Sequence, residues 1–212
     1  EILNPDGSMA RRPELEVFAR EHGLKMGSIE ELIRYRIATE HTIERVDERE
    51  IETEHGPFRL LSYRDRLSHG LHFALVLGEV DAAIPTLVRV HVQNPLADAL
   101  HWRRSDFGPA VGDVLATIAQ EGCGALVLLG DHADADALLA RVRAQPQAEP
   151  GHSDLEQPTR GHALAEWRRN GAGAQILADL GLGKLRVLGT PRKQIGLAGF
   201  GLEVVEYVEP AH

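Results

Sequence analysis

The sequence has little cysteine, few basic residues and no long hydrophobic run. A single cysteine, Cys123, among 212 residues excludes an internal disulfide and a multi-cysteine metal site. No apolar run reaches the roughly 18 residues that a membrane helix needs, so we expect no membrane partner. With 23 basic against 32 acidic residues the net charge is -9, which argues against a nucleic-acid-binding surface. These features are typical of a cytoplasmic protein.

The rest of the composition is that of a globular chain, with 43% hydrophobic and 26% charged residues. It allows one sizeable domain, or one domain with an appendage. Cys123 lies at the start of an expected strand, where we predict a small buried side chain. The chain begins with Glu1 and a turn-like NPDGS and shows no signal peptide. This beginning is typical of the middle of a longer protein.

Two short helices are predicted near the amino end. Pro13 suits the first turn of one helix, and Gly23 ends it. A capping box at Ser28 opens the second, from Ile29 to about Tyr35. The charge-dense segment that follows, Thr39 to Glu52, is either a solvated linker or an edge strand whose charges discourage unwanted pairing. We expect a second domain to begin there.

The remaining pattern is that of an α/β domain. Strands are expected at Phe58–Tyr63, Leu71–Leu77 and Pro85–Val92, the last followed by a helix from Val111 that ends at Gly122. The continuous apolar run Ala125–Leu129 predicts a strand covered on both faces, and the strand, helix, strand order indicates an α/β unit. A further strand is expected at Leu185–Leu188, after a flexible loop from Gln145 to His162.

Two groups of polar residues suggest cation sites. His69 and His72 flank an expected strand, but no third ligand accompanies them. Asp131, Asp134 and Asp136 lie close together, but their spacing is not that of a calcium loop. Aspartates before the apolar run that follows are expected as helix caps. We therefore favour capping and predict no metal ion in this chain.

Residues 1–39 resemble the end of 3,4-dihydroxy-2-butanone-4-phosphate synthase. The first eleven residues, EILNPDGSMAR, match its signature E-I-x-N-x-D-G-x-M-A-R. The resemblance implies that Glu1 is a catalytic carboxylate that transfers protons on ribulose 5-phosphate. The rest of that site, and the magnesium it is expected to use, belong upstream. We expect no cofactor in this chain, and this fragment alone should not run the reaction.

Residues 40–212 resemble GTP cyclohydrolase II. The matches include GAQILADLG, GLAGFGLEVVE and the stretch RVHVQNPLADALHWRRSDFG, which has the frame of that family's metal loop, R-V-H-x-E-C-x-x-G-D-x-x-x-x-x-R-C-D-C-G. The resemblance implies an α/β fold with a mixed sheet and flanking helices, preceded by the short helical tail of the synthase domain. It also implies a homodimer with a synthase domain earlier in the same chain.

The loop keeps the family's frame and lacks its zinc ligands. The three cysteine positions are occupied by Asn94, Ser105 and Phe107. Asparagine and serine offer only neutral, weakly donating oxygens, and phenylalanine has no lone pair, whereas a catalytic zinc needs three protein ligands. Without the cation, the pKa of a bound water does not fall to about 7. We predict no zinc here and no zinc-dependent opening of a guanine ring.

Other functional positions of the family are changed as well. The arginine of its nucleotide segment corresponds to Asp134, and its tyrosine to Gln145. Arg168 matches the arginine implicated in attack on the triphosphate, and is either retained for catalysis or a surface or ion-paired residue. Arg104 and Lys193 are retained basic residues that could meet a nucleotide phosphate.

Three functional hypotheses follow. In the first, this is a degenerate domain of a riboflavin-pathway protein that stabilises, dimerises or regulates a synthase, a lyase, located upstream. In the second, it is an active GTP cyclohydrolase II with an altered metal site, for which His91, Asp98 and Asp106 could offer ligands. In the third, it is a non-catalytic nucleotide sensor that keeps a basic phosphate subsite.

Overall fold

The computed structural model describes residues 2–27, 31–32, 35, 40–104, 107–130, 139, 142–143, 160–191 and 197–209, without the side chains of 160–168. The chain divides into two compact units, Glu1–Arg36 and Ile37–His212. Each is described by itself. The predicted boundary, between residues 39 and 40, lies next to residues outside the described part, and it stays a prediction.

The first unit contains the predicted amino-terminal helix. Helix α1 spans Arg12–Glu21, and the carboxylate of Glu14 accepts a hydrogen bond of 2.8 Å from the backbone N–H of Arg11 just before the helix. Gly23 has a φ of 64°, a left-handed conformation that suits a helix stop. The helix is confirmed. The second predicted helix, Ile29 to Tyr35, falls largely outside the described residues, and so does Glu1.

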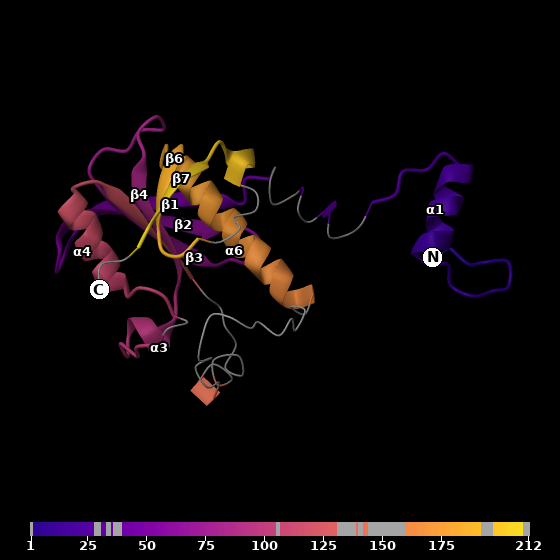
Figure 1. Ribbon diagram of the computed structural model, residues 1–212, viewed down its shortest axis with the longest axis horizontal. Helices are drawn as coiled ribbons and strands as arrows, with labels where there is room; N and C mark the ends of the chain where they lie inside the picture. The colour runs from indigo at the N-terminus through magenta and orange to yellow at the C-terminus, as the bar shows by residue number, and fades with distance from the viewer. Residues whose placement is uncertain are drawn as a thin grey trace. The chain divides into compact units, whose positions relative to one another are not determined.

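Within the described part of the second unit, the strands form one seven-stranded sheet in the order β1-β2-β3-β5-β4-β6-β7 (Figure 1). Strands β1 to β3 and β5 pair antiparallel, whereas β5, β4, β6 and β7 run parallel. The sheet is therefore mixed, as predicted. The strands are β1 (Ile43–Thr53), β2 (Gly56–Asp65), β3 (Leu71–Leu77), β4 (Thr86–Val92), β5 (Gly124–Leu129), β6 (Lys184–Leu188) and β7 (Glu203–Val208).

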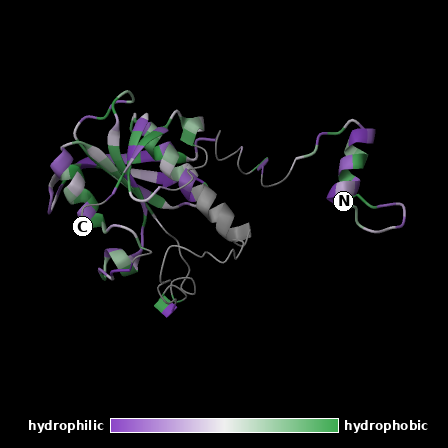
Figure 2. Cartoon of the chain, in the orientation of Figure 1, coloured by the Kyte–Doolittle hydropathy of each residue, from purple (hydrophilic) through white to green (hydrophobic). Residues whose placement is uncertain are grey.

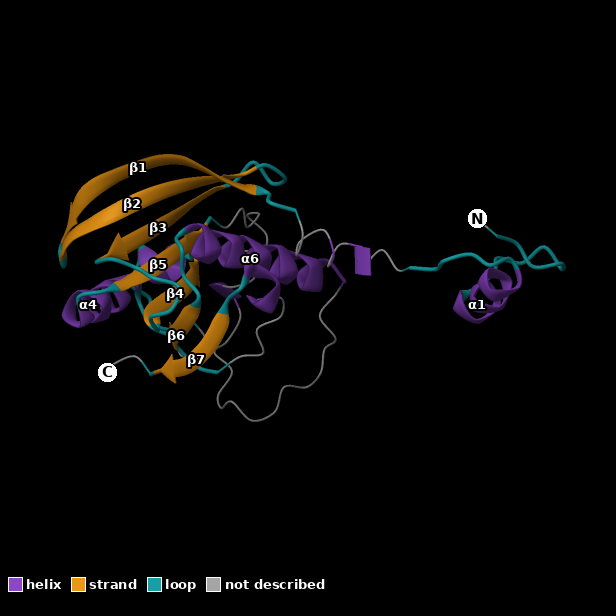
Figure 3. Cartoon of the chain, turned by 90° about the horizontal axis from the view of Figure 1, so that it is seen from above, coloured by secondary structure: helices purple, strands orange, loops and turns teal. Residues whose placement is uncertain are grey.

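Strand β1 decides between the two interpretations of the charged segment. It forms one edge of the sheet and pairs with β2 along its length, so the segment is an edge strand and not a linker (Figure 3). Most of its side chains are exposed, and its register shifts between Arg45 and Asp47. Charges and a bulge both make an edge strand a poor template for pairing with another chain.

Helices α4 (Val111–Glu121) and α6 (Arg160–Asp179) pack on opposite faces of the sheet. Because successive side chains of a strand point to opposite faces, Val127 contacts the α6 side and its neighbour Leu126 the α4 side. Both are fully buried, so β5 is covered on both faces, as predicted. Figure 2 shows the hydropathy of the chain, with green hydrophobic residues in the strands of the sheet.

The parallel pair β4 and β5, joined through α4, confirms the predicted α/β unit. Helix α4 ends at Gly122, whose φ of 77° closes the last turn, also as predicted. The shorter elements are α3 (Pro95–Asp98) and the 3-10 turn η1 (Leu197–Phe200). No helix in the described ranges combines the length and apolar character required to span a bilayer.

Two local predictions are wrong. Cys123 is partly exposed and not buried, because it precedes β5 at the end of the turn from α4; its thiol donates to the carbonyl oxygen of Glu79 at 3.1 Å. Burial and nearby Glu121 still raise the pKa of Cys123. The expected loop to His162 ends earlier, because α6 begins at Arg160. The Ala-Leu-Ala-Glu run after His162 has high helix propensity and favours this earlier start.

Gly183 gives a direct test of the packing between β6 and the β3–β4 connection. A Cβ at this position would overlap the carbonyl oxygen of Ala82 and lie 3.0 Å from its carbonyl carbon. Because backbone cannot move aside cheaply, we expect Gly183→Ala to lower the free energy of unfolding by about 1–3 kcal/mol in a urea titration. Gly199 serves as the control, because a Cβ there would meet nothing within 4 Å. Gly199→Ala should change the free energy of unfolding by less than about 1 kcal/mol.

Candidate functional site

The parallel strands β4, β5 and β6 all end at the same edge of the sheet. Open α/β sheets bind ligands in the crevice outside the carboxyl ends of their strands. The loop after β4 carries the stretch that resembles a metal loop, and the loop after β6 begins at Gly189. This edge is therefore the candidate functional site.

His91, near the end of β4, is paired with Asp98 of α3. The Nε2 atom of His91 lies 2.9 and 3.1 Å from the two carboxylate oxygens of Asp98, and the His91 side chain is only 5% exposed. Asp98 also accepts a hydrogen bond of 2.7 Å from the backbone N–H of Asn94. The Asp98 carboxylate thus links the start of the loop to β4, and both of its oxygens have hydrogen-bond partners.

Asn94, the first of the three substituted cysteine positions, caps α3. Its side-chain oxygen accepts a hydrogen bond of 3.2 Å from the backbone N–H of Leu96. Asparagine is among the residues most favoured at this position, because its oxygen satisfies a backbone donor that the helix leaves unpaired. The Asn94 side chain therefore has a structural role in the loop.

Phe107, the third of these positions, belongs to a small aromatic group with Trp102. The two rings are 6.0 Å apart and nearly perpendicular, at 87°. The guanidinium carbon of Arg104 lies 4.9 Å from the Phe107 ring centre and 5.3 Å from that of Trp102. A cation this close to ring faces is attracted by their quadrupoles. Arg104, predicted to bind a phosphate, is thus held against two rings, and its phosphate role stays a prediction.

Arg89 connects the loop after β4 with the loop after β6. Its Nη1 atom donates to the carbonyl oxygen of Leu188 at 2.9 Å. A Cβ on Gly189 would lie 2.5 Å from Nη1, and one on Gly108 would lie 2.9 Å from Nη2. Both glycines have positive φ, 136° and 73°, so the two loops approach the guanidinium where glycine is required. In the sequence, Arg89 is the first residue of the stretch that matches the metal-loop frame, and nothing there predicts these contacts.

The histidine pair considered as a metal site is divided between two environments. His72 is 5% exposed and its Nδ1 accepts a hydrogen bond of 3.0 Å from the backbone N–H of Gly130, whereas His69 is exposed. Among the residues that the structure describes, no three His, Cys, Asp or Glu side chains are grouped so that they could hold a metal. His72 instead fixes the end of β5, where the next loop begins.

The described part of the loop does not fit the zinc ion that the family resemblance implies. Asn94 is used as a cap, Phe107 has no donor atom, and His91 is paired with Asp98. A tetrahedral zinc needs thiolate, imidazole or carboxylate ligands directed at one point. These side chains offer no such set.

Several predicted positions lie outside the described residues. They are Glu1, Ser105, Asp106, Asp131, Asp134, Asp136, Gln145 and Lys193. Arg168 lies in α6, where its backbone is described and its side chain is not. The roles assigned to these residues stay predictions.

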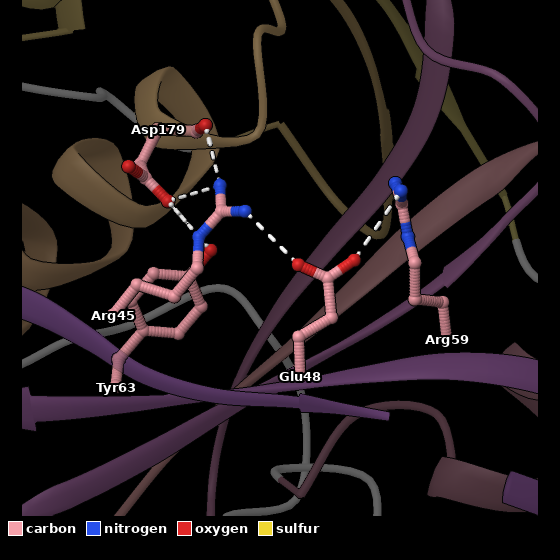
Figure 4. A network of polar contacts seen from close by, with 5 residues as sticks. All are labelled: Arg45, Glu48, Arg59, Tyr63 and Asp179. Carbon is pink, nitrogen blue, oxygen red and sulfur yellow. Dashed lines mark hydrogen bonds and ion pairs between the residues drawn. The ribbon is translucent and has the colours of Figure 1, made fainter. Parts of the chain in front are cut away.

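A polar network at the end of α6 was not predicted from the sequence. Asp179 accepts hydrogen bonds from the Tyr63 hydroxyl at 2.8 Å and from Nε of Arg45 at 2.9 Å (Figure 4). Arg45 also reaches Glu48 at 3.1 Å, and Glu48 lies 3.5 Å from Arg59. Burial, together with the hydrogen bond to Asp179, raises the pKa of Tyr63. The only sequence signal was the aspartate in GAQILADLG.

The Tyr63 contact predicts a pH-dependent contribution to stability. Tyr63→Phe removes the hydrogen bond to a charged acceptor, so we expect the free energy of unfolding to fall by about 1.5–3 kcal/mol near pH 7. Because the folded-state pKa of Tyr63 is raised, the wild-type advantage is complete below the unfolded-state pKa of about 10 and declines above it. Urea titrations at pH 7 and 10.5 check this, and a difference that grows with pH contradicts it.

With this geometry in place, two family models match the chain. The model of GTP cyclohydrolase II matches residues 44–209, and that of 3,4-dihydroxy-2-butanone 4-phosphate synthase matches residues 1–35. The resemblances noted in the sequence are thereby confirmed. Residues 36–43 lie between the two matched regions.

Individual relatives agree with the family models. The chain is 48% identical over 214 residues to a 3,4-dihydroxy-2-butanone 4-phosphate synthase of Pseudomonas syringae pv. tomato, covering 98% of this chain and 55% of that protein. It is 40% identical over 209 residues to riboflavin biosynthesis protein RibBA of Bacillus cereus, covering 98% of this chain and 53% of that protein.

A solved structure is similar as well. RibBX of A. baumannii, described as a two-domain 3,4-dihydroxy-2-butanone 4-phosphate synthase, matches with a TM-score of 0.62 and 37% identity, over 100% of this chain and 53% of that one. The chain thus spans about half the length of the relatives it matches. It belongs to the GTP cyclohydrolase II family and carries, ahead of that domain, a segment of the 3,4-dihydroxy-2-butanone 4-phosphate synthase family of riboflavin biosynthesis.

Proposed function

We propose that residues 40–212 form a cyclohydrolase-like domain that does not hydrolyse GTP. Its role is to stabilise, dimerise or regulate a 3,4-dihydroxy-2-butanone 4-phosphate synthase in the same protein, which acts on ribulose 5-phosphate in the cytoplasm. This proposal rests on the contacts made by the residues that stand at two of the family's cysteine positions. Asn94 caps a helix, and Phe107 packs against Trp102 and Arg104.

The chemistry of GTP ring opening explains why these positions matter. Hydrolysis at neutral pH needs an activated water, and a zinc ion supplies it by lowering the pKa of its bound water to about 7. A neutral amide that already accepts a hydrogen bond and a benzyl side chain cannot replace thiolates. In the described part of the loop, a helix cap and aromatic packing take the place of metal ligands.

The names of the relatives support the same function. The proteins from Pseudomonas syringae, Pseudomonas aeruginosa and Photobacterium phosphoreum are named for the synthase activity alone. RibBX, which has two domains, is likewise described as a synthase. In this chain we assign Glu1 to the synthase site by resemblance. The rest of that site, with its magnesium, we assign to the upstream part of the protein.

The alternative of a cyclohydrolase with an altered metal site has weaker support. Its candidate ligands include His91 and Asp98, whose Nε2 atom and carboxylate already bind each other at 2.9 Å. The nucleotide-sensor alternative depends on Arg104, whose guanidinium is held over two aromatic rings. Neither arrangement favours these functions over a structural or regulatory role.

A truncation of the full-length protein tests the proposed role. We expect removal of residues 40–212 to lower the synthase turnover of ribulose 5-phosphate, its thermal stability or its dimerisation. Analytical ultracentrifugation, a thermal melt and a turnover assay on both proteins measure these quantities. If all three are the same with and without the domain, the proposed role is wrong. Heat released on titration with GTP would favour the sensor.

A further inference from the structure

The first unit, Glu1–Arg36, has almost no hydrophobic core of its own. Among the residues of this unit that the structure describes, only Ala10 is buried, at 8% exposed. Helix α1 contains no buried residue, and its apolar side chains Leu15 and Phe18 are only partly covered. Chains as short as this unit usually need a disulfide, a metal ion or a partner surface in order to fold.

The first two of these means are not found in the unit. The single cysteine of the sequence is Cys123, so the unit contains no disulfide. In the part of the unit that the structure describes, no three His, Cys, Asp or Glu side chains are grouped to hold a metal. Helix α1 has 10 residues, fewer than the roughly 12–15 that an isolated helix needs in water. The unit therefore needs a surface against which it can pack.

The turn ahead of α1 presents a pair of apolar side chains to such a surface. Leu3 and Met9 form an antiparallel β-bridge, and the backbone N–H of Asn4 donates to the carbonyl oxygen of Ser8 at 2.8 Å. Directly opposite residues of an antiparallel pair point to the same face. Leu3 is 60% exposed and Met9 is 41% exposed, so two neighbouring large apolar side chains are largely uncovered within the unit.

The comparisons indicate what covers this pair. The synthase family model matches residues 1–35, and the chain covers only 55% of the Pseudomonas syringae synthase. Elements of one domain share one hydrophobic core. We propose that Leu3 and Met9 dock on the upstream part of the synthase, and that the hairpin and α1 are stable only when docked there. This inference rests on one part of the function proposed above, namely a synthase located upstream in the same protein.

Amide hydrogen exchange on two proteins without substitutions tests the inference. In the 212-residue chain, we expect the backbone N–H groups of Asn4, Ala10 and Leu15 to exchange within about tenfold of the rate of an unstructured peptide. In the full-length protein they should exchange roughly a hundredfold more slowly, because docking buries the two apolar side chains. Strand β5 should exchange slowly in both proteins, which shows that the sheet is folded in each.

A substitution in the full-length protein identifies the docking face. Leu3→Ser removes the more exposed side chain of the pair, so we expect the same three N–H groups to exchange roughly tenfold faster than in the wild type. Ile84→Ser is the matched control, because Ile84 is also 60% exposed but lies in the β3–β4 connection of the second unit. It should leave these three exchange rates unchanged. If Leu3→Ser does not fold, the comparison of the unsubstituted proteins still decides.

Three results would overturn the inference. Slow exchange in the 212-residue chain at every protein concentration would mean that the unit folds without a partner. Slow exchange that appears only at high concentration would identify a second copy of the chain as the occupant. Equal exchange in Leu3→Ser and wild-type full-length protein would mean that Leu3 is not docked.

The proposed function is tested separately, by truncation of residues 40–212. If that truncation lowers synthase turnover, stability or dimerisation while Leu3→Ser has no effect on exchange, the inference is wrong and the proposed function stands. If the truncation has no effect while Leu3→Ser speeds exchange, the docking face is correct and the role proposed for the cyclohydrolase-like domain is wrong.

Discussion

Restoring cysteines at positions 94, 105 and 107 is expected to give a protein that binds about one zinc ion per chain. The triple variant Asn94→Cys, Ser105→Cys, Phe107→Cys supplies three thiolates. The start of the loop that carries them is already held to β4 by the His91–Asp98 pair. Because zinc–thiolate binding is strong at neutral pH, the metal should survive gel filtration. Inductively coupled plasma analysis measures the zinc content.

Two controls separate metal binding from activity in this experiment. The variant Asn94→Ser, Ser105→Ala, Phe107→Ala disturbs the same positions without adding thiolates and should hold no zinc. The triple-cysteine variant should still release no formate from GTP, because Asp134 and Gln145 stand where the family has an arginine and a tyrosine. No zinc in the triple-cysteine variant would mean that the frame of the metal loop has not been kept.

Removing the carboxylate of Asp98 should lower the stability of the domain substantially. Asp98→Ala takes the partner from buried His91 and the acceptor from the Asn94 N–H. Asp98 is 23% exposed, so the cost should fall below the 3–5 kcal/mol of a fully buried pair, at about 2–3 kcal/mol. For a chain of this size that corresponds to a drop of about 4–12 °C in melting temperature.

A control for Asp98→Ala is available on the other edge of the sheet. Glu203 is exposed at the start of β7, and Glu203→Ala should change the free energy of unfolding by less than about 0.5 kcal/mol. Urea titration of both variants measures the difference. Equal stabilities would show that the His91–Asp98–Asn94 contacts do not hold the loop in place.

Most of the fold could be predicted from the sequence because its signals are local. The apolar run Ala125–Leu129 predicted a strand covered on both faces, and Gly122 marked the end of α4. The edge-strand alternative for residues 39–52 was open, since charge density alone fits a linker equally well. Pairing with β2 decides it, and pairing is a long-range property that no local pattern contains.

The contacts in the candidate site were less predictable for the same reason. The absence of cysteine at positions 94, 105 and 107 was visible directly, but not that Asn94 caps a helix or that Arg104 lies over two rings. Gln175 accepts hydrogen bonds from the backbone N–H groups of Thr42 and Ile43, and no local pattern predicted them, because these donors lie 133 and 132 residues earlier in the chain. Side-chain chemistry is visible in a sequence, whereas the partner of each side chain depends on the folded structure.

We propose that this domain keeps the cyclohydrolase fold without its metal chemistry. The most direct test measures zinc content and formate release on one preparation of the full-length protein, incubated with zinc, desalted and supplied with GTP. We expect a zinc content well below one ion per chain and no formate above the protein-free control. One tightly bound zinc per chain together with steady formate release would contradict it.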